Sequence, residues 1–252
     1  MSEELVLRGG LVVDGSGAPG TIADVVIAGG TIVAIGQDLE RPEADVVDVS
    51  GLVVAPGFID IHTHSDLSAV RDPSSESKVR QGVTTDVIGN CGFSTFPIEP
   101  SRIDIHLDLV EVIGSGNRDV KLSWTDVDGY VQAVASRPPA LNLAPLVGHH
   151  MLRTAAMGLE QRAPTDGELA TMKRLLAEQL EQGAFGLSTG LTLVPGVYAE
   201  EGEIVELLNV VAEHDALYST HSRGDGERDF GSGSGDSNGN RRWRKAPVLP
   251  RR

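Results

Sequence analysis

The stretch PGFIDIHTHSD, residues 56–66, says most about the fold of this chain. A short apolar run at Phe58–Ile61 leads directly into His62 and His64, which one residue separates. Residues two apart in a β-strand point to the same face, so both imidazoles can face one pocket. Two neutral imidazoles on one face make half of a zinc site, and Asp66 follows shortly after them. The stretch therefore predicts a strand whose carboxyl end carries metal ligands, with a pair of structural histidines as the alternative.

Further short apolar segments alternate with helical patterns along residues 56–223. Continuous apolar strands between helices indicate a parallel sheet that is covered on both faces. Ligands bind at the carboxyl ends of the strands in such folds, and most of these segments end in polar or metal-capable residues. We therefore expect an α/β fold whose site lies where the strand ends meet. The four further predicted strands are Thr84–Ile88, Leu143–Val147, Ala184–Leu187 and Ala216–Ser219.

The helix before the fourth of these segments has clear end signals. Thr165 and Glu168 have the spacing of a capping box. Leucine and methionine side chains recur at helical spacing up to Leu180, and Gly183 supplies a C-terminal stop.

Residues 1–55 have a different pattern, with short runs of β-forming residues around paired glycines. Gly9-Gly10 and Gly29-Gly30 each separate two such runs, which is typical of hairpin turns. We expect two hairpins in a small β domain over residues 1–55, ahead of the α/β part over residues 56–223.

Cys91 and His221 are the other candidate metal ligands. Cys91 follows an apolar strand within Gly-Asn-Cys-Gly, and a thiolate is a strong zinc ligand. The alternative is a buried, inert thiol. His221 follows the fifth strand and fits a ligand or a hydrogen-bonded core histidine equally well. His149 follows the third strand and can line the pocket, whereas we expect His106 to be exposed to solvent.

Composition excludes several classes of protein. The 252 residues carry a net charge of −15, and the pI of about 4.8 argues against a nucleic-acid-binding surface. No stretch approaches the roughly 18 apolar residues of a membrane span. The acidic start MSEELVLRGG is not a secretory signal. A single cysteine excludes a disulfide framework and fits a reducing cytosol, so we expect a cytoplasmic protein.

Taken in their order along the chain, these motifs resemble the D-aminoacylase, or N-acyl-D-amino-acid deacylase, family of the amidohydrolase superfamily. Each motif is modest alone, but their order is specific. The resemblance implies an amidohydrolase-type (β/α)8 TIM barrel beside a small β domain. It also implies a zinc-dependent enzyme in which metal-activated water hydrolyses N-acyl-D-amino acids, which are small-molecule substrates. The motifs after residue 66 are GNCGFSTFP at 89–97, LVGHHMLR at 146–153, RAPTDGEL at 162–169, GAFGLSTGL at 183–191 and YSTHSR at 218–223.

The resemblance also implies roles for individual residues. Cys91 and His221 match the ligands of a tightly held zinc, which a histidine of strand six completes in the family. His62 and His64 match a weaker second metal position, together with a strand-eight aspartate that serves as catalytic acid and base. Our candidates for the substrate pocket are Tyr198, His149 and Arg223.

The composition changes abruptly after residue 223. Residues 224–252 hold seven basic and four acidic residues, six glycines and no apolar periodicity, which predicts a low-complexity, disordered tail. The family's strand-six histidine and strand-eight aspartate have no counterpart, so the catalytic residue stays unassigned. We expect an incomplete barrel of strands one to five, as in a truncated or frame-shifted member of the family.

Two other functions stay open at this point. One is a cyclic amidase of the dihydropyrimidinase or dihydroorotase kind, against which Cys91 and the lack of a lysine at a strand end both count. The other is a truncated chain that binds zinc through its histidines and cysteine and catalyses no reaction.

Overall fold

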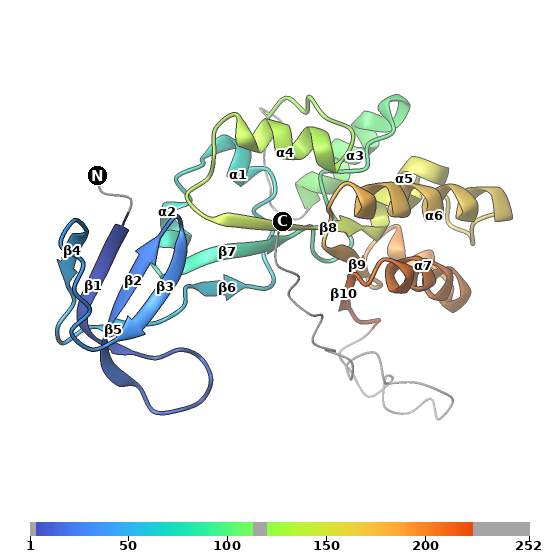
Figure 1. Cartoon of the computed structure of the whole chain (residues 1–252). Helices are drawn as coiled ribbons and strands as arrows, with labels where there is room; N and C mark the ends of the chain where they lie inside the picture. Colours follow the sequence, from blue (N-terminus) through green and yellow to red (C-terminus); the bar gives the residue numbers. More distant parts are fainter. Residues whose placement is uncertain (1–3, 113–119, 224–252) are drawn as a thin grey trace. The chain divides into compact units, whose positions relative to one another are not determined.

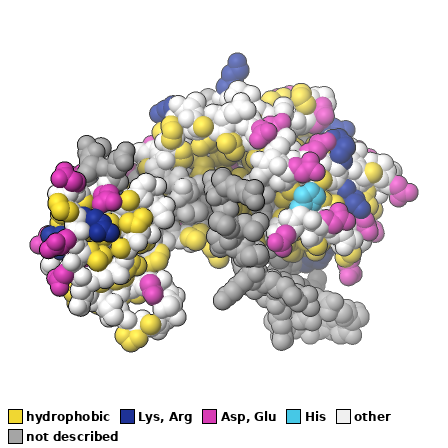
Figure 2. All heavy atoms as spheres, in the orientation of Figure 1, with side chains coloured by type: hydrophobic (Ala, Val, Ile, Leu, Met, Phe, Trp, Pro, Cys, Tyr) yellow, Lys and Arg dark blue, Asp and Glu magenta, His cyan; other side chains and the backbone are white. Residues whose placement is uncertain are grey.

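A computed structural model describes residues 4–112 and 120–223 (Figure 1). Internal contacts divide the chain into two compact units, Met1–Phe58 and Ile59–Arg252. The tail predicted over residues 224–252 lies outside the described residues. On the face shown in Figure 2, acidic side chains are scattered over both units, in keeping with the net charge of −15.

The first unit is a mixed sheet with the strand order β3-β2-β1-β4, and β5 also pairs with β1. The pairs β1–β2 and β2–β3 are antiparallel, whereas β4 and β5 both run parallel to β1. The strands are β1 Glu4–Val12, β2 Thr21–Ala28, β3 Thr31–Gly36, β4 Asp45–Asp48 and β5 Val53–Val54.

Only one of the two predicted hairpins forms. Gly29-Gly30 joins β2 to β3, with Ala28 opposite Thr31, as predicted. The hairpin predicted at Gly9-Gly10 is wrong, because β1 continues through these glycines. Its register to β2 shifts there, and Gly9 has a φ of +72°. A glycine in the left-handed region can form a β-bulge as well as a turn, and the backbone N–H of Gly9 donates to the Asp24 carboxylate over 2.9 Å.

The second unit contains the predicted five-stranded sheet, whose spatial order β10-β9-β8-β7-β6 follows the chain. The pairs β7–β8, β8–β9 and β9–β10 are all parallel. The fourth and fifth strands begin and end slightly later than predicted, so that His221 is the last residue of β10. The strands are β6 Phe58–Asp60, β7 Val83–Ile88, β8 Asn142–Gly148, β9 Gly186–Gly190 and β10 Leu217–His221.

Helices connect these strands, and α5, α6 and α7 pack against one another in turn (Figure 1). The capping box predicted at the start of α6 is confirmed: Glu168 donates its backbone N–H to the Thr165 hydroxyl and accepts the Thr165 N–H. Met172 and Leu176 of α6 are fully buried in the core. None of the helices within residues 4–112 and 120–223 combines the length and apolar character of a membrane span. The helices are α1 Ser68–Arg71, α2 Glu76–Val79, α3 Ile103–Val110, α4 Val127–Ala135, α5 His149–Met157, α6 Asp166–Glu181 and α7 Glu201–Glu213, with 3-10 turns η1 Pro100–Arg102 and η3 Gly196–Tyr198.

Candidate metal centre

Three predicted ligands meet at the carboxyl edge of the parallel sheet. One possible ligand atom from each of His62, His64 and Cys91 lies within 4.8 Å of the other two. The His62 Nε2 and the Cys91 Sγ are 3.1 Å apart, and the two imidazole rings meet edge-on with centroids separated by 5.6 Å. His221 joins from β10, with its Nδ1 at 3.8 Å from the same sulfur. The structure thus brings the three predicted histidine ligands around the thiol of the fourth predicted ligand, Cys91.

A tight turn after β7 places Cys91 at this edge. Cys91 has a φ of +55°, an unusual value for a residue with a side chain, and glycines flank it closely on both sides. A Cβ atom on Gly89 would lie 2.2 Å from the Leu146 carbonyl oxygen, so a larger residue does not fit there. The Gly92 N–H donates to the Ser188 hydroxyl over 3.0 Å, and that hydroxyl donates to the Gly89 carbonyl. The neighbouring strands therefore hold the thiol in place.

Burial shifts the pKa of two groups of the cluster, Cys91 and His64. Burial raises the pKa of the Cys91 thiol. Burial, and then the nearby His62, lowers the pKa of His64. The buried His64 Nδ1 has no hydrogen-bond partner among the described residues. A neutral imidazole with an unpartnered nitrogen and a thiol beside it form a donor set that fits a metal ion.

The three predicted pocket residues do not join this cluster as directly. Tyr198 is half-buried in η3, and the exposed Arg223 donates to the Ala199 carbonyl over 2.6 Å. His149 is fully buried at the start of α5, with its Nε2 at 2.7 Å from the Glu203 carboxylate. Their role in a substrate pocket stays a prediction.

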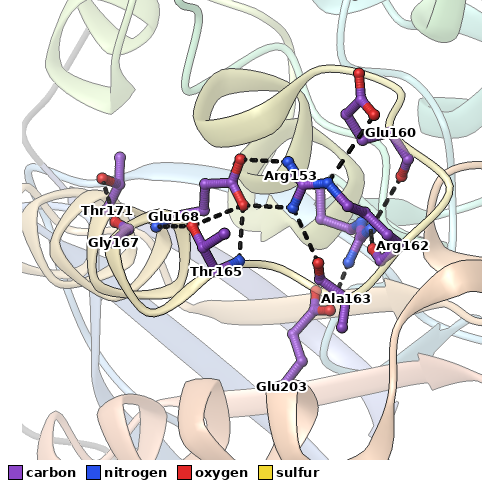
Figure 3. Close-up of polar contacts among 9 residues, drawn as sticks. All are labelled: Arg153, Glu160, Arg162, Ala163, Thr165, Gly167, Glu168, Thr171 and Glu203. Carbon is purple, nitrogen blue, oxygen red and sulfur yellow. Dashed lines mark hydrogen bonds and ion pairs between the residues drawn. The ribbon is translucent and has the colours of Figure 1, made fainter.

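His149 belongs to a buried polar network around Arg153. The Arg153 guanidinium pairs with Glu203 and donates to the Arg162 carbonyl over 2.8 Å (Figure 3). Burial opposes ionisation of Glu203, but the His149 hydrogen bond and the Arg153 charge hold its pKa below the usual value. Burial lowers the pKa of His149, so this ring is neutral. Arg162 also pairs with Glu168 at the surface.

The sequence did not predict the positions of His106 and Lys78. Exposure of His106 was a wrong expectation, because its ring is buried on the inner face of α3 and burial lowers its pKa to about 4. Its i+3 and i+4 neighbours, Leu109 and Val110, are buried too, and their spacing was the available signal. Lys78 follows no strand, yet its ammonium group reaches back to Asp60 at the end of β6.

Comparisons with known proteins agree with this geometry. The chain is 42% identical over 224 residues to a D-aminoacylase of Alcaligenes xylosoxydans xylosoxydans, covering 89% of this chain and 45% of the relative. A crystal structure of N-acyl-D-glutamate deacylase from Bordetella bronchiseptica, complexed with zinc and a phosphonate inhibitor, matches with a TM-score of 0.79 and 41% identity over 87% of this chain and 45% of that chain. A structure of D-aminoacylase, which has a binuclear metal centre, matches with a TM-score of 0.78 and 39% identity over 89% of this chain and 46% of that chain.

Dihydroorotases match more weakly: one from Solibacter usitatus covers only 29% of this chain, and one from Thermoanaerobacter sp. covers 85% of it at 26% identity, so the cyclic amidase alternative is not favoured. The two solved structures confirm the predicted fold, an incomplete amidohydrolase barrel with a small β domain. The chain spans about 45% of the length of the curated D-aminoacylase that it matches. The model of the amidohydrolase family matches residues 45–242. With this match and relatives about 40% identical, the chain belongs to the amidohydrolase family.

Proposed function

We propose that this chain carries the zinc-binding part of a hydrolase that cleaves the amide bond of N-acyl-D-amino acids. The observation that carries the proposal is the cluster of His62, His64 and Cys91, with His221 beside the thiol. The similarity to a D-aminoacylase and to an N-acyl-D-glutamate deacylase supports the substrate class.

The donor set of the cluster fits zinc. A thiolate combined with imidazoles favours zinc over magnesium or calcium, which prefer oxygen ligands. The unpartnered Nδ1 of His64 leaves one buried lone pair available to a metal. When bound, zinc polarises a carbonyl oxygen and lowers the pKa of a bound water to about 7.

The chain's own residues bind and orient the reactants in this proposal. His62 and His64 would hold the metal from the residues after β6, Cys91 from the turn after β7 and His221 from the end of β10. Arg223 lies two residues beyond His221, and its contact with Ala199 uses one of the five N–H donors of a guanidinium. The other donors supply a binding group for the carboxylate of an amino-acid product or substrate.

Tyr198 and His149 complete the proposed pocket. Tyr198 precedes Ala199, the residue that Arg223 contacts, so its half-buried ring borders the same loop. His149 supports the pocket through packing, because its hydrogen bond to Glu203 fixes the start of α5. A reduced thiol as a ligand suits a reducing compartment, and we propose a cytoplasmic location on this ground.

The test uses the whole 252-residue chain. Competition with a chromophoric chelator measures zinc affinity for the wild type and for Cys91→Ser, and we expect tight binding that the serine variant loses. Assays with zinc then compare N-acetyl-D-amino acids, their L-enantiomers and a cyclic ureide. Zinc-dependent release of the D-amino acid supports the proposal, and preference for the ureide favours a cyclic amidase. Zinc binding without hydrolysis of either class favours a non-catalytic zinc-binding chain, and absence of zinc binding sinks the proposal.

A further inference from the structure

Lys78 of α2 contacts the segment that carries two of the proposed ligands. Its ammonium group donates to the Asp60 carboxylate and, over 3.0 Å, to the Thr63 hydroxyl. The same nitrogen lies 3.7 Å from the carboxylate of the buried Asp86. Three oxygen atoms, from the end of β6, the segment after it and the middle of β7, therefore lie around one lysine whose side chain is 24% exposed.

The two carboxylates in turn hold the segment on both sides of the histidines. Asp60 accepts the backbone N–H of His62 over 3.1 Å. Asp86 accepts the Ser65 hydroxyl over 2.7 Å. Residues 60–65 are thus tied to one ammonium group before, between and after the two histidines.

This segment has little packing to fix it otherwise. Two of the three β6 residues are exposed, with Phe58 at 65% and Ile59 at 60%, and Ile61 is exposed as well. Ordering a backbone residue costs about 1–2 kcal/mol in conformational entropy, and a segment without buried side chains must recover that cost from polar contacts. Besides the pairing of β6 with β7 and a backbone hydrogen bond from the Thr63 N–H to the Val87 carbonyl over 3.4 Å, the contacts of Lys78 hold the segment at this point.

We propose that Lys78 is a positioning residue for metal binding, which holds His62 and His64 in place through Asp60, Thr63 and the Asp86–Ser65 pair. The proposal rests on the metal site of the proposed function. It predicts that metal affinity falls, and does not rise, when the positive charge of Lys78 is removed. Removal of a positive charge near a cation site strengthens cation binding if Coulomb forces alone act. Loss of positioning weakens binding instead, by the roughly 10–100-fold typical of residues that orient metal ligands.

The experiment titrates the full chain with Co²⁺ and measures zinc affinity by competition. It compares the wild type with Lys78→Met, Lys78→Arg and the control Lys173→Met, which removes an ammonium group paired with Glu206 over 2.6 Å on the helical layer. We expect Lys78→Met to bind zinc about 10–100-fold more weakly and to shift the Co²⁺ visible bands at saturation. The arginine variant should fall between it and the wild type, and the control should bind within about twofold of the wild type.

Equal or tighter zinc binding by Lys78→Met, with unchanged Co²⁺ bands, overturns the positioning role and leaves the metal site standing. No Co²⁺ or zinc binding by the wild type overturns the metal site and the positioning role together. If Lys78→Met fails to fold by circular dichroism, Thr63→Val decides the question. This variant removes one acceptor of Lys78 and keeps the charge, and we expect severalfold weaker zinc binding. Wild-type affinity in a folded Thr63→Val variant overturns the proposal.

Discussion

Two pairs of histidines follow strand ends of the same parallel sheet, yet the structure uses them differently. His62 and His64, after β6, lie beside the Cys91 thiol. His149 and His150, after β8, are fully buried at the start of α5. Their Nε2 atoms lie 2.7 Å from the Glu203 carboxylate and 3.0 Å from the Gly190 carbonyl oxygen. Paired histidines at a strand end are therefore ambiguous until the partner of each ring nitrogen is known.

The position of the strand in the sheet accounts for this difference. β6 is an outer strand of the described sheet, whereas β8 pairs on both sides and leads directly into α5. Burial lowers the pKa of His150 to about 3, and it also lowers the pKa of His149. A neutral ring that is fixed by an internal hydrogen bond serves packing. The rings of His149 and His150 each also have an Nδ1 without a partner among the described residues, so what distinguishes the outer pair is the Cys91 thiol beside it.

The largest effect on stability should come from Glu203, which contacts His149 of the buried histidine pair and forms an ion pair with Arg153. Glu203→Gln keeps the shape of the side chain but leaves the fully buried Arg153 without its countercharge. We expect the free energy of unfolding to fall by about 3–5 kcal/mol, measured by chemical denaturation at pH 7. The matched control is Glu206→Gln, which breaks the more exposed pair with Lys173 and should cost at most about 1 kcal/mol. Similar losses in the two variants would contradict a structural role for the buried network.

The next effect concerns how the free energy of unfolding depends on pH through His150 of the buried pair. The pKa of His150 is about 3 in the folded chain and about 6.5 when unfolded, so the unfolded state takes up the proton first. Stability is thus independent of this group above pH 6.5. It then falls by about 1.4 kcal/mol per pH unit as the pH drops towards 3.

We expect His150→Gln to reduce that slope by one proton, in unfolding curves recorded between pH 7 and pH 4. The exposed His62 offers the control substitution, His62→Gln, which removes no buried ring. A slope that is unchanged in His150→Gln would show that this ring is accessible to solvent protons in the folded state.

A smaller effect on stability is expected at Arg162, at the surface end of the network around Arg153. Arg162 forms a surface pair with Glu168, next to the buried pair of Arg153 and Glu203 (Figure 3). Exposed ion pairs contribute about 0–1 kcal/mol, so Arg162→Gln should lower the free energy of unfolding by no more than this amount. Denaturation at low and at high salt measures the difference. A loss above 2 kcal/mol would show that the network is one unit, with no boundary at the surface.

The smallest effect on stability should come from His62, the exposed member of the outer pair. His62→Gln removes a proposed ligand whose side chain is solvent-exposed, so the free energy of unfolding should change by less than about 0.5 kcal/mol. Zinc affinity should nevertheless fall more than it does in any variant of the buried network. Denaturation of the metal-free chain and chelator competition give the two quantities. A large loss of stability with unchanged zinc affinity would reverse the assignment of the two pairs.

The features that the sequence predicted well depend on local patterns. The five parallel strands follow from apolar runs, and the Thr165–Glu168 capping box follows from spacing. The meeting of His62 with Cys91 follows from the rule that parallel strands end at one edge, and the family resemblance supports it. These predictions needed no knowledge of contacts between distant side chains.

The features that the sequence left open depend on long-range contacts. Lys78 reaches Asp60 across 18 positions in the chain, and Glu203 reaches His149 across 54. Neither spacing has a periodic signature. The Gly9 bulge was mistaken for a turn because both conformations need the same backbone freedom, and only pairing with β2 distinguishes them.

The parallel sheet has one more consequence, for how the chain folds. Each strand from β6 to β10 neighbours the strand that precedes or follows it in sequence. Every new strand can therefore add to an edge that already exists, without waiting for a distant segment to be synthesised. The sheet can grow during translation in the order in which the ribosome releases it. His62 and Cys91 would then meet early, well before β10 delivers His221.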